Sequence, residues 1–411
     1  MKVLLVTEYY PPTIFGGGEI STKILAQTLS KNNIEVHVLT SSQNSLPIYE
    51  EKDKTKIHRL LKTGSDPSSL IENFKRVTFL QKSIKKEIKK LDKKERYNII
   101  HFLNTTTIPT FKLNIRAKKI ATYNSYTNFC PKRNLFYKDK EACSGSSYLK
   151  CMNCMANSDY IGKTKVPKYL KYNPLFWIYL YQNYKSHKKG LKNIDHHIAI
   201  SEYLDNLLQK NKIKKTNISI IPNLAELTET NELFKIEEKG FIITYAGTLE
   251  KIKGIDLLIK AIIELNDPEI KLILFGEGSQ KEELKKISND NIKFYGKIDH
   301  KYIGSIYKQS NLIILPTLWP EPFARNLLEA TYYGKPIVAT NTGGTKDSVI
   351  DGKNGFLVSP NIDELKDKIS FLKNNKELLE RMGKESKKIY NEKFNNKKVI
   401  KKIIEVYKHE K

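Results

Sequence analysis

Short apolar segments alternate with helical patterns in two consecutive arrays, and this alternation constrains the fold more than any other feature. The first array begins with KVLLVT at residues 2–7, and the second begins with FIITYAG at residues 241–247. Short runs rich in Val, Ile and Leu are typical of strands buried on both faces of a parallel sheet. Because helical patterns lie between the runs, the sequence predicts an α/β fold with two doubly wound, Rossmann-like sheets.

The two arrays also indicate where domains begin and end. We expect a first domain at residues 1–222 and a second domain at residues 241–385. Residues 223–240 between them are polar and acidic, as is typical of a linker, and residues 386–411 form a basic helical segment. With 411 residues, the chain is long enough to bury a separate core in each domain.

Positive charge is concentrated in the first half of the chain. Residues 1–222 contain 39 basic and 17 acidic side chains, a net charge of 39 − 17 = +22, whereas the rest contains 32 and 28, a net charge of 32 − 28 = +4. This asymmetry favours an anionic partner for the first domain. A nucleic acid would match the charge, but the sequence has no helix-turn-helix, zinc-finger or RNP motif, so we expect no specific nucleic-acid binding.

The apolar segments are too short for a signal peptide or a membrane span, so we expect a cytoplasmic protein. The longest uncharged apolar stretch, residues 172–184, has 13 residues, and a span needs about 20. Aromatic side chains recur from Tyr169 to Tyr184 between lysine-rich flanks. Two interpretations stay open: the segment packs as a core helix, or it places the first domain on the anionic inner face of a membrane.

Three loops follow predicted strands at the edge where such sheets bind ligands. Gly16–Gly18 precedes a helical pattern whose first N–H groups suit an anion, and Lys253 can point at a phosphate from the loop after FIITYAG. In the third loop, Pro322 marks a helix entry, which places Glu321 before the helix and Glu329 one to two turns inside it. The N–H groups of Phe323, Ala324 and Arg325 would then be free at the positive end of that helix.

These motifs, together with FGEG and TNTGGTKDSVIDGKNGFLV, resemble glycosyltransferase family 4, whose members are retaining enzymes of the GT-B fold. The resemblance covers nearly the whole chain and keeps the motifs in order. It implies two domains facing across a cleft, a nucleotide-sugar donor held mainly by the second domain, an acceptor held mainly by the first, and a last helix that returns to the first domain. It also implies metal-independent transfer of a hexosyl group from a UDP- or GDP-sugar to a glycan or lipid-linked acceptor, in polysaccharide, glycolipid or glycoprotein synthesis.

The resemblance further implies roles for individual residues. Glu321 would contact the transferred sugar, Glu329 the ribose, Lys253 the diphosphate, and Ile298 the base through its backbone. The implied donor-binding set is Gly17, Gly18, Thr248, Lys253, Ile298, Glu321, Phe323, Ala324, Arg325 and Glu329, and the implied catalytic set is Glu321, Lys253 and Asn124.

Three positions depart from the family pattern. Thr248 replaces a common arginine, Ala324 replaces a common glycine, and Asn124 replaces a common histidine. Asparagine forms hydrogen bonds but cannot become cationic. The alternative function is therefore a catalytically impaired module that binds a nucleotide sugar. A nucleotide-sugar epimerase is a more distant alternative, which the two spaced glutamates do not favour.

All four cysteines lie within 25 residues, at Cys130, Cys143, Cys151 and Cys154. Four thiolates suit a tetrahedral zinc ion or an iron–sulfur cluster, so we expect a structural metal site in an insertion at about residues 125–160. Free thiols in a loop, or disulfides in an oxidising compartment, are the alternatives. An insertion of this kind resembles a feature of one subfamily.

Overall fold

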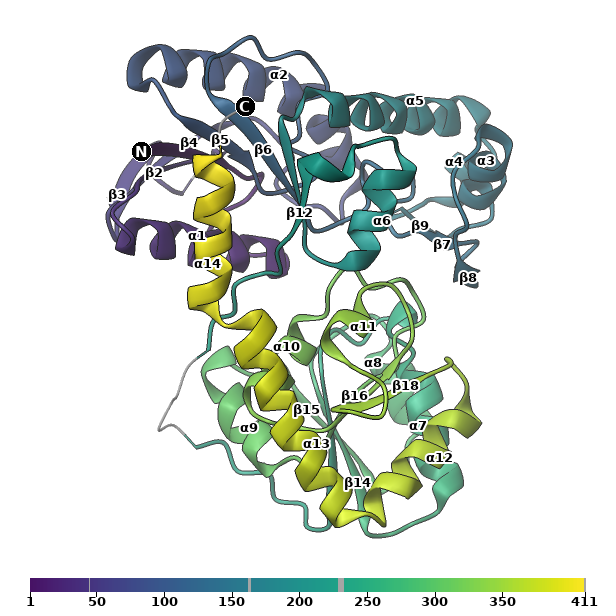
Figure 1. Ribbon diagram of the computed structural model, residues 1–411. Coiled ribbons are helices and arrows are strands. Elements are labelled where there is room, and N and C mark those ends of the chain that lie inside the picture. The colour runs from purple at the N-terminus through teal and green to yellow at the C-terminus, as the bar shows by residue number, and fades with distance from the viewer. Residues whose placement is uncertain (44, 162–163, 228–232, 410–411) are drawn as a thin grey trace. The chain divides into compact units, whose positions relative to one another are not determined.

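The computed structural model describes residues 1–43, 45–161, 164–227 and 233–409. The chain divides into two compact units, and Figure 1 shows both. Unit 1 comprises Met1–Leu224 and Asn396–Lys411, and unit 2 comprises Ala225–Asn395. Each unit is built on its own parallel sheet, so the prediction of two doubly wound sheets is confirmed.

The sheet of unit 1 has the strand order β12-β11-β6-β5-β1-β2-β4-β3, and every neighbouring pair is parallel except β3 with β4. Its strands are β1 (Lys2–Val6), β2 (Glu35–Ser41), β3 (Tyr49–Lys52), β4 (Thr55–Leu61), β5 (Ile99–Phe102), β6 (Lys118–Tyr123), β11 (His196–Ala199) and β12 (Ile218–Ile220). Residues Val3 to Val6 of β1 are completely buried between β2 and β5, as their apolar run predicts.

Helices and two short hairpins surround this sheet (Figure 1). The helices are α1 (Gly17–Lys31), α2 (Leu70–Glu95), α3 (Tyr148–Ala156), α4 (Lys168–Lys171), α5 (Pro174–Gly190), α6 (Glu202–Lys210) and α14 (Asn396–Lys408), with 3₁₀ turns at Leu191–Asn193 and Lys215–Asn217. The hairpins pair β7 (Phe136–Tyr137) with β8 (Glu141–Ala142) and β9 (Tyr160–Ile161) with β10 (Thr164–Lys165). Among the described helices, none combines the length and the apolar character needed to cross a bilayer.

The sheet of unit 2 has the order β15-β14-β13-β16-β17-β18, and all neighbouring pairs are parallel. Its strands are β13 (Phe241–Ala246), β14 (Ile270–Phe275), β15 (Ile292–Gly296), β16 (Leu312–Leu315), β17 (Ile337–Thr340) and β18 (Gly355–Val358). Its helices are α7 (Ile255–Leu265), α8 (Lys281–Lys286), α9 (Ile303–Gln309), α10 (Arg325–Tyr332), α11 (Thr345–Ser348), α12 (Ile362–Lys373) and α13 (Lys376–Ile389), with 3₁₀ turns at Lys251–Lys253 and His300–Tyr302.

The direction of strand order reverses once in each sheet, between β1 and β5 in unit 1 and between β13 and β16 in unit 2. Ligands of open α/β sheets bind outside the carboxyl ends of the strands at such a switch point. The glycine loop follows β1, the Lys253 loop follows β13, and the Glu321 loop follows β16. The topology therefore gathers the predicted loops at the two switch points.

The end of the chain returns to unit 1, but later than expected. Residues 386–395 stay with unit 2, because α13 continues into a π-helical turn, Tyr390–Phe394, whose Tyr390 ring lies 5.0 Å from that of Tyr332. Only α14 belongs to unit 1, where Tyr407 Oη lies 2.7 Å from His101 Nδ1. Lys118 donates hydrogen bonds to the carbonyls of Val406 and His409 and so satisfies the end of the helix.

The structure does not keep all of residues 223–240, the expected linker, outside the two units. Unit 2 begins at Ala225, and Ile236 is already buried in its core. The backbone N–H groups of Phe234 and Ile236 donate to Ser305 Oγ and Gln309 Oε1. Residues 228–232 of the expected linker lie outside the described residues.

Candidate functional site

Lys253 and Glu321 form an ion pair at the carboxyl edge of the unit 2 sheet. Lys253 ends the 3₁₀ turn after β13, and Glu321 lies in the loop after β16. The Lys253 Nζ donates to Glu321 Oε2 at 2.6 Å, and Trp319 Nε1 donates to the same oxygen at 2.9 Å. Lys253 Nζ also lies 5.4 Å from the centre of the Trp319 ring. Two loops that are distant in sequence thus place a cation and a carboxylate side by side.

A third loop fixes the backbone of Glu321. The N–H of Gly344 donates to the Glu321 carbonyl at 2.6 Å. Gly343 has φ +58°, and a Cβ at that position would lie 2.3 Å from the same carbonyl oxygen. Only glycine fits both the left-handed conformation and the close approach. The TNTGG motif therefore positions Glu321 from the end of β17.

Glu329 is held by a histidine that the sequence patterns did not single out. Glu329 lies in α10 and is almost fully buried, and its Oε1 is 2.8 Å from His300 Nε2. The hydrogen bond to Glu329 raises the pKa of His300 above its ordinary value. His300 begins the 3₁₀ turn that follows β15, two residues after Ile298. Its position in the loop after a strand was the available signal in the sequence.

The remaining donor-binding candidates of unit 2 differ in how exposed they are. Thr248 is exposed, and its carbonyl accepts a hydrogen bond from Tyr245 Oη at 2.8 Å. Ile298 is half-buried and packs against the core of unit 2. The expectation for Phe323 and Ala324 was wrong in one respect: α10 begins at Arg325, so these two residues precede the helix and are buried.

In unit 1, the structure brings Gly18 together with Asn124. A Cβ at Gly18 would lie 3.2 Å from Asn104 Nδ2 and 3.4 Å from Asn124 Nδ2. Asn124 in turn donates to the Leu103 carbonyl at 2.9 Å. A pocket opens here, lined by residues that include Gly18, Thr22, His101, Thr122, Asn124 and Asn223. Gly17 is the first residue of α1, so this pocket lies beside the positive end of that helix.

The sequence matches two family models. The model described as Glycosyltransferase Family 4 matches residues 15–229, which is more than half of the chain, and the model described as Glycosyl transferases group 1 matches residues 228–389. The chain belongs to glycosyltransferase family 4. The boundary between the two matches falls close to the boundary between the two units.

Curated relatives of this family 4 chain include two archaeal proteins. An uncharacterized glycosyltransferase of Methanocaldococcus jannaschii is 32% identical over 230 residues, covering 53% of this chain and 59% of the relative. A second one from the same organism is 25% identical over 419 residues, covering 99% and 98%. The chain spans about half to three fifths of the length of the first relatives that it matches.

Solved structures of glycosyltransferases share the fold. Sucrose-phosphate synthase from Thermosynechococcus elongatus superposes with a TM-score of 0.72 at 19% identity, covering 99% of this chain and 98% of that one. Anabaena HepE, in complex with UDP, superposes with a TM-score of 0.65 at 15% identity, covering 98% and 99%. The predicted GT-B fold is therefore confirmed.

The family 4 chain also contains a buried ion pair at the switch point of unit 1 that the sequence analysis missed. Glu8 follows β1 by two residues, and its Oε1 accepts from Arg76 Nε of α2 at 2.6 Å. Thr63 and Thr106 donate to the Glu8 carboxylate at 2.7 and 2.8 Å. The partners come from three distant segments, so no local sequence signal announces the cluster.

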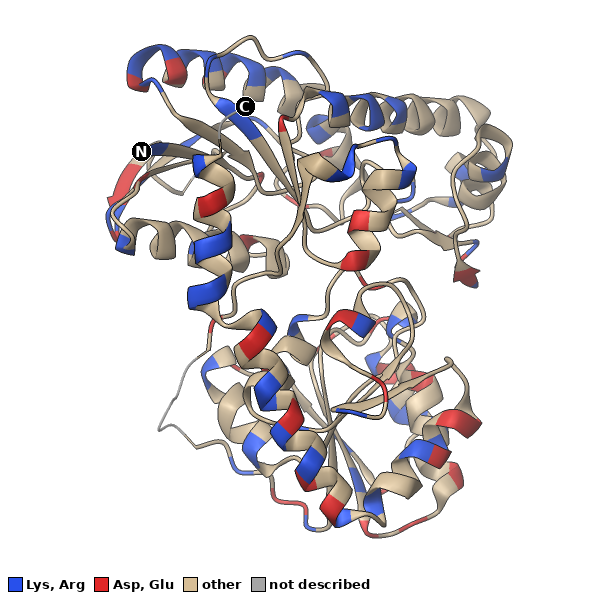
Figure 2. Ribbon diagram, viewed as in Figure 1, with Lys and Arg blue, Asp and Glu red and all other residues tan. Residues whose placement is uncertain are grey.

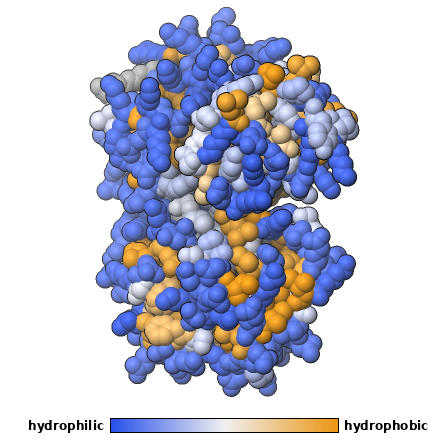
Figure 3. Space-filling model, turned by 90° about the vertical axis from the view of Figure 1, so that its right-hand side faces the viewer, coloured by the Kyte–Doolittle hydropathy of each residue, from blue (hydrophilic) through white to orange (hydrophobic). Residues whose placement is uncertain are grey.

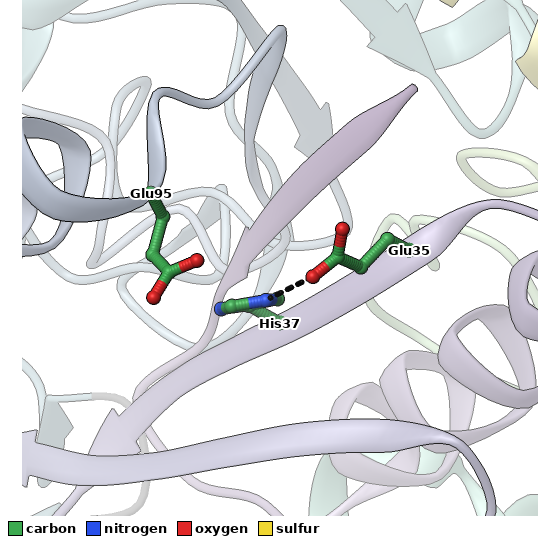
Figure 4. A group of neighbouring side chains, drawn as sticks. All are labelled: Glu35, His37 and Glu95. Carbon is green, nitrogen blue, oxygen red and sulfur yellow. Dashed lines mark hydrogen bonds and ion pairs between the residues drawn. The ribbon is translucent and has the colours of Figure 1, made fainter.

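One group of potential metal ligands lies away from these sites. Glu35, His37 and Glu95 place ligand atoms within 4.8 Å of one another (Figure 4), near the amino ends of β1 and β2. Lys2 already bridges the two carboxylates at 2.8 and 3.4 Å, and Lys56 donates to Glu35 at 2.9 Å. The hydrogen bond from Lys56 is the main reason why the pKa of Glu35 is lowered to about 2. The two lysines neutralise this group, so it does not need a metal ion.

Proposed function

We propose that this chain is a retaining glycosyltransferase that moves a hexosyl group from a UDP- or GDP-sugar to a glycan or lipid-linked acceptor. The observation that carries the proposal is the Lys253–Glu321 pair beside the switch point of unit 2, with the buried Glu329 on the helix that follows. The family membership and the UDP and UDP-glucose bound in HepE structures support a nucleotide-sugar donor. Without these residues the fold alone would not indicate an activity.

Lys253 is the residue suited to stabilise the leaving group. When the bond between the anomeric carbon and the phosphate oxygen breaks, negative charge develops on the diphosphate. A cation held close to that oxygen stabilises the charge, and the amide groups at the start of α10 add to the effect. Lys253 is mostly buried, with 18% of its side chain exposed, so water screens it weakly. A protein cation can thus supply what a metal ion supplies in other transferases.

The Lys253–Glu321 pair also suggests how the site changes when the donor binds. The two charges satisfy each other at 2.6 Å. A diphosphate carries more negative charge than one carboxylate, so it competes for Lys253 and releases an oxygen of Glu321. That oxygen can then accept a hydrogen bond from a hydroxyl of the transferred sugar. When Lys253 exchanges Glu321 for the diphosphate, diphosphate binding would therefore be coupled to recognition of the sugar by Glu321.

Retention follows if the acceptor oxygen attacks from the face that the phosphate leaves. The new bond forms between the acceptor oxygen and the anomeric carbon, the phosphate oxygen keeps the electron pair of the broken bond, and it takes the acceptor proton. This route needs no carboxylate nucleophile, so Glu321 serves as a hydrogen-bond acceptor rather than as a base. Within unit 1, Asn124 donates a hydrogen bond to the Leu103 carbonyl, and its amide cannot carry charge.

Release of nucleotide from a panel of UDP- and GDP-sugars tests the proposal. We expect one base class to support release above the uncatalysed rate, and added acceptor to increase it. A binding module without activity would bind a donor by calorimetry and release nothing. Donor binding without release by any member of the panel would therefore favour the alternative function.

We further propose that unit 1 holds its acceptor at an anionic membrane surface. Lysines gather along α2 and α5 (Figure 2), and exposed apolar side chains lie on the same elements. Phe74 of α2 stacks on Tyr179 of α5 with ring centres 5.5 Å apart, so the two helices form one surface. Figure 3 shows apolar patches among hydrophilic side chains on the side where α3 and α4 lie. We define the apolar surface as Ile71, Phe74, Tyr169, Tyr172, Leu175 and Tyr179.

This surface combines the two features of a peripheral membrane site. Tyr172 and Leu175 are 87% and 73% exposed, whereas Phe176 and Trp177 on the other side of α5 are buried in the fold. Aromatic side chains favour the bilayer interface, and each nearby lysine adds about 1 kcal/mol of attraction to anionic lipid. One face of the segment therefore packs in the fold, and the exposed face is the one we propose for contact with lipid.

The double variant Tyr172→Ala/Leu175→Ala should bind vesicles that contain anionic lipid several-fold more weakly than the original protein in a co-sedimentation assay. Leu233→Ala is the matched control, because Leu233 is an equally exposed leucine of unit 2. Raising the salt from about 0.05 M to about 0.5 M should release the original protein by screening the lysines. Equal binding to neutral and anionic vesicles would contradict the proposal.

A further inference from the structure

The four cysteines converge on one pocket although they come from three separate elements. Cys130 lies in the loop after β6, Cys143 directly follows β8, and Cys151 and Cys154 lie on α3. The two helical cysteines are three residues apart and therefore share one helix face. All four are free thiols, and all four line the same pocket together with Lys132 and Lys150.

The segment that carries these cysteines contains little regular secondary structure. Strands β7 and β8 have two residues each, as do β9 and β10, and so short a hairpin is not stable alone. Helix α3 has nine residues, and its Met155 joins a small apolar cluster with Phe176 and Trp177. The pocket is lined by the four cysteines together with Pro131, Phe136 and Met155. A small scaffold of this kind usually needs a cross-link.

The backbone beside the cysteines has an unusual local conformation and supplies a donor to sulfur. Arg133 and Leu135, in the loop that follows Cys130, have φ of +67° and +51°. The N–H of Lys138 donates to Cys154 Sγ at 3.2 Å. A neutral thiol is a weak acceptor, so a backbone donor to this sulfur suits a thiolate.

A buried thiolate requires a compensating cation. Lys132 is completely buried beside the pocket, but its ammonium is already bound to Asp139 and Ser158. The pocket has a volume of about 20 Å³, which is enough for one ion.

We propose that Cys130, Cys143, Cys151 and Cys154 bind one zinc ion as a tetrahedral four-thiolate site that stabilises unit 1. The zinc site is separate from the residues proposed for transfer. An experiment can therefore contradict the zinc site without contradicting the proposed glycosyltransferase activity. Among the described residues, no three of these sulfurs lie within 4.8 Å of one another, so the ion would draw them inward. Zinc would then join the loop, the β7–β8 hairpin and α3 into one body.

Metal analysis of the full-length protein, purified without a metal-affinity step, tests the proposal. We expect about one zinc per chain and negligible iron. Cobalt exchanged into the site should show the visible absorption bands of tetrahedral thiolate coordination. Because the chain has only four cysteines, a variant that lacks all four provides a spectrum without any thiolate contribution.

Two variants separate loss of the site from loss of the fold. Cys143 is the least buried cysteine, so Cys143→Ser should remove most of the zinc and lower the melting temperature while the protein still folds. Glu35→Ala should leave the zinc content unchanged, because Glu35 is a more exposed member of the separate Glu35–His37–Glu95 group. Less than about one tenth of an equivalent of zinc, stoichiometric iron with sulfide, or a disulfide detected by mass spectrometry would each overturn the proposal.

Discussion

Replacing Lys253 by alanine should reduce the rate of glycosyl transfer by about 10²- to 10³-fold, the usual effect of removing one group that stabilises transition-state charge. Lys253 is the cation that forms the ion pair with Glu321. Among the described residues of unit 2, no other cation pairs with Glu321 and could replace it. The effect should appear mainly in kcat, because charge on the diphosphate grows as the bond breaks.

The neighbouring Lys251 provides the matched control for this substitution. Lys251 is exposed and lies in the same 3₁₀ turn, so Lys251→Ala removes the same charge two residues away. We expect less than about a twofold change for that variant, because exposed charges are strongly screened. Loss of Lys253 leaves Glu321 with the Trp319 hydrogen bond, and the melting temperature should therefore be measured in parallel. Equal rates for both variants would contradict the role of Lys253.

Replacing Glu329 by alanine should weaken donor binding by about 10- to 100-fold in a calorimetric titration, since a hydrogen bond to a charged group contributes ~1.5–3 kcal/mol. Glu329 is buried at the carboxyl edge of the unit 2 sheet, where it can accept hydrogen bonds from ribose hydroxyls. Glu282→Ala is the control, because Glu282 is a largely exposed carboxylate of α8 in the same unit. Unchanged donor affinity in Glu329→Ala would contradict the assignment of Glu329 to the donor ribose.

His300 offers an independent readout of the same substitution. The hydrogen bond to Glu329 raises the pKa of His300 above its ordinary value of 6.5, so the stabilisation from this pair is complete below that pH. It is lost as the pH rises through the raised value. In Glu329→Gln, an NMR titration should show the pKa of His300 decrease, whereas Glu321→Gln should leave it unchanged. A decrease in neither variant would mean that the pair does not form in solution.

The sequence predicted the elements of the fold better than their ends. Apolar runs such as KVLLVT identify strands because burial on both faces depends on the run itself. The returning helix was expected from residue 386, whereas unit 1 resumes at Asn396, because the basic helical pattern continues through residues 376–408 while the packing partner changes from unit 2 to unit 1. The start of α10 was placed three residues early, because Pro322 marks the loop before the helix rather than its first turn.

The sequence predicted which loops carry the candidate site, but it did not predict which side chains form pairs with one another. Lys253 and Glu321 were each singled out because they follow strands, yet their contact joins residues 68 positions apart. His300 and the Glu8–Arg76 pair were missed for the same reason. Such contacts depend on strand order, which a single sequence does not encode locally. In the aromatic segment, Phe176 and Trp177 pack in the fold, as the core-helix interpretation predicts, whereas contact of its exposed face with a membrane stays a prediction.

The anomeric configuration of the product is the most direct test of the central claim. A donor that supports nucleotide release should be incubated with an acceptor, and the product examined by NMR. We predict transfer with the configuration of the donor retained at the anomeric carbon, and loss of that product in Lys253→Ala. An inverted product, or hydrolysis of the donor with no transfer to any acceptor, would contradict the account.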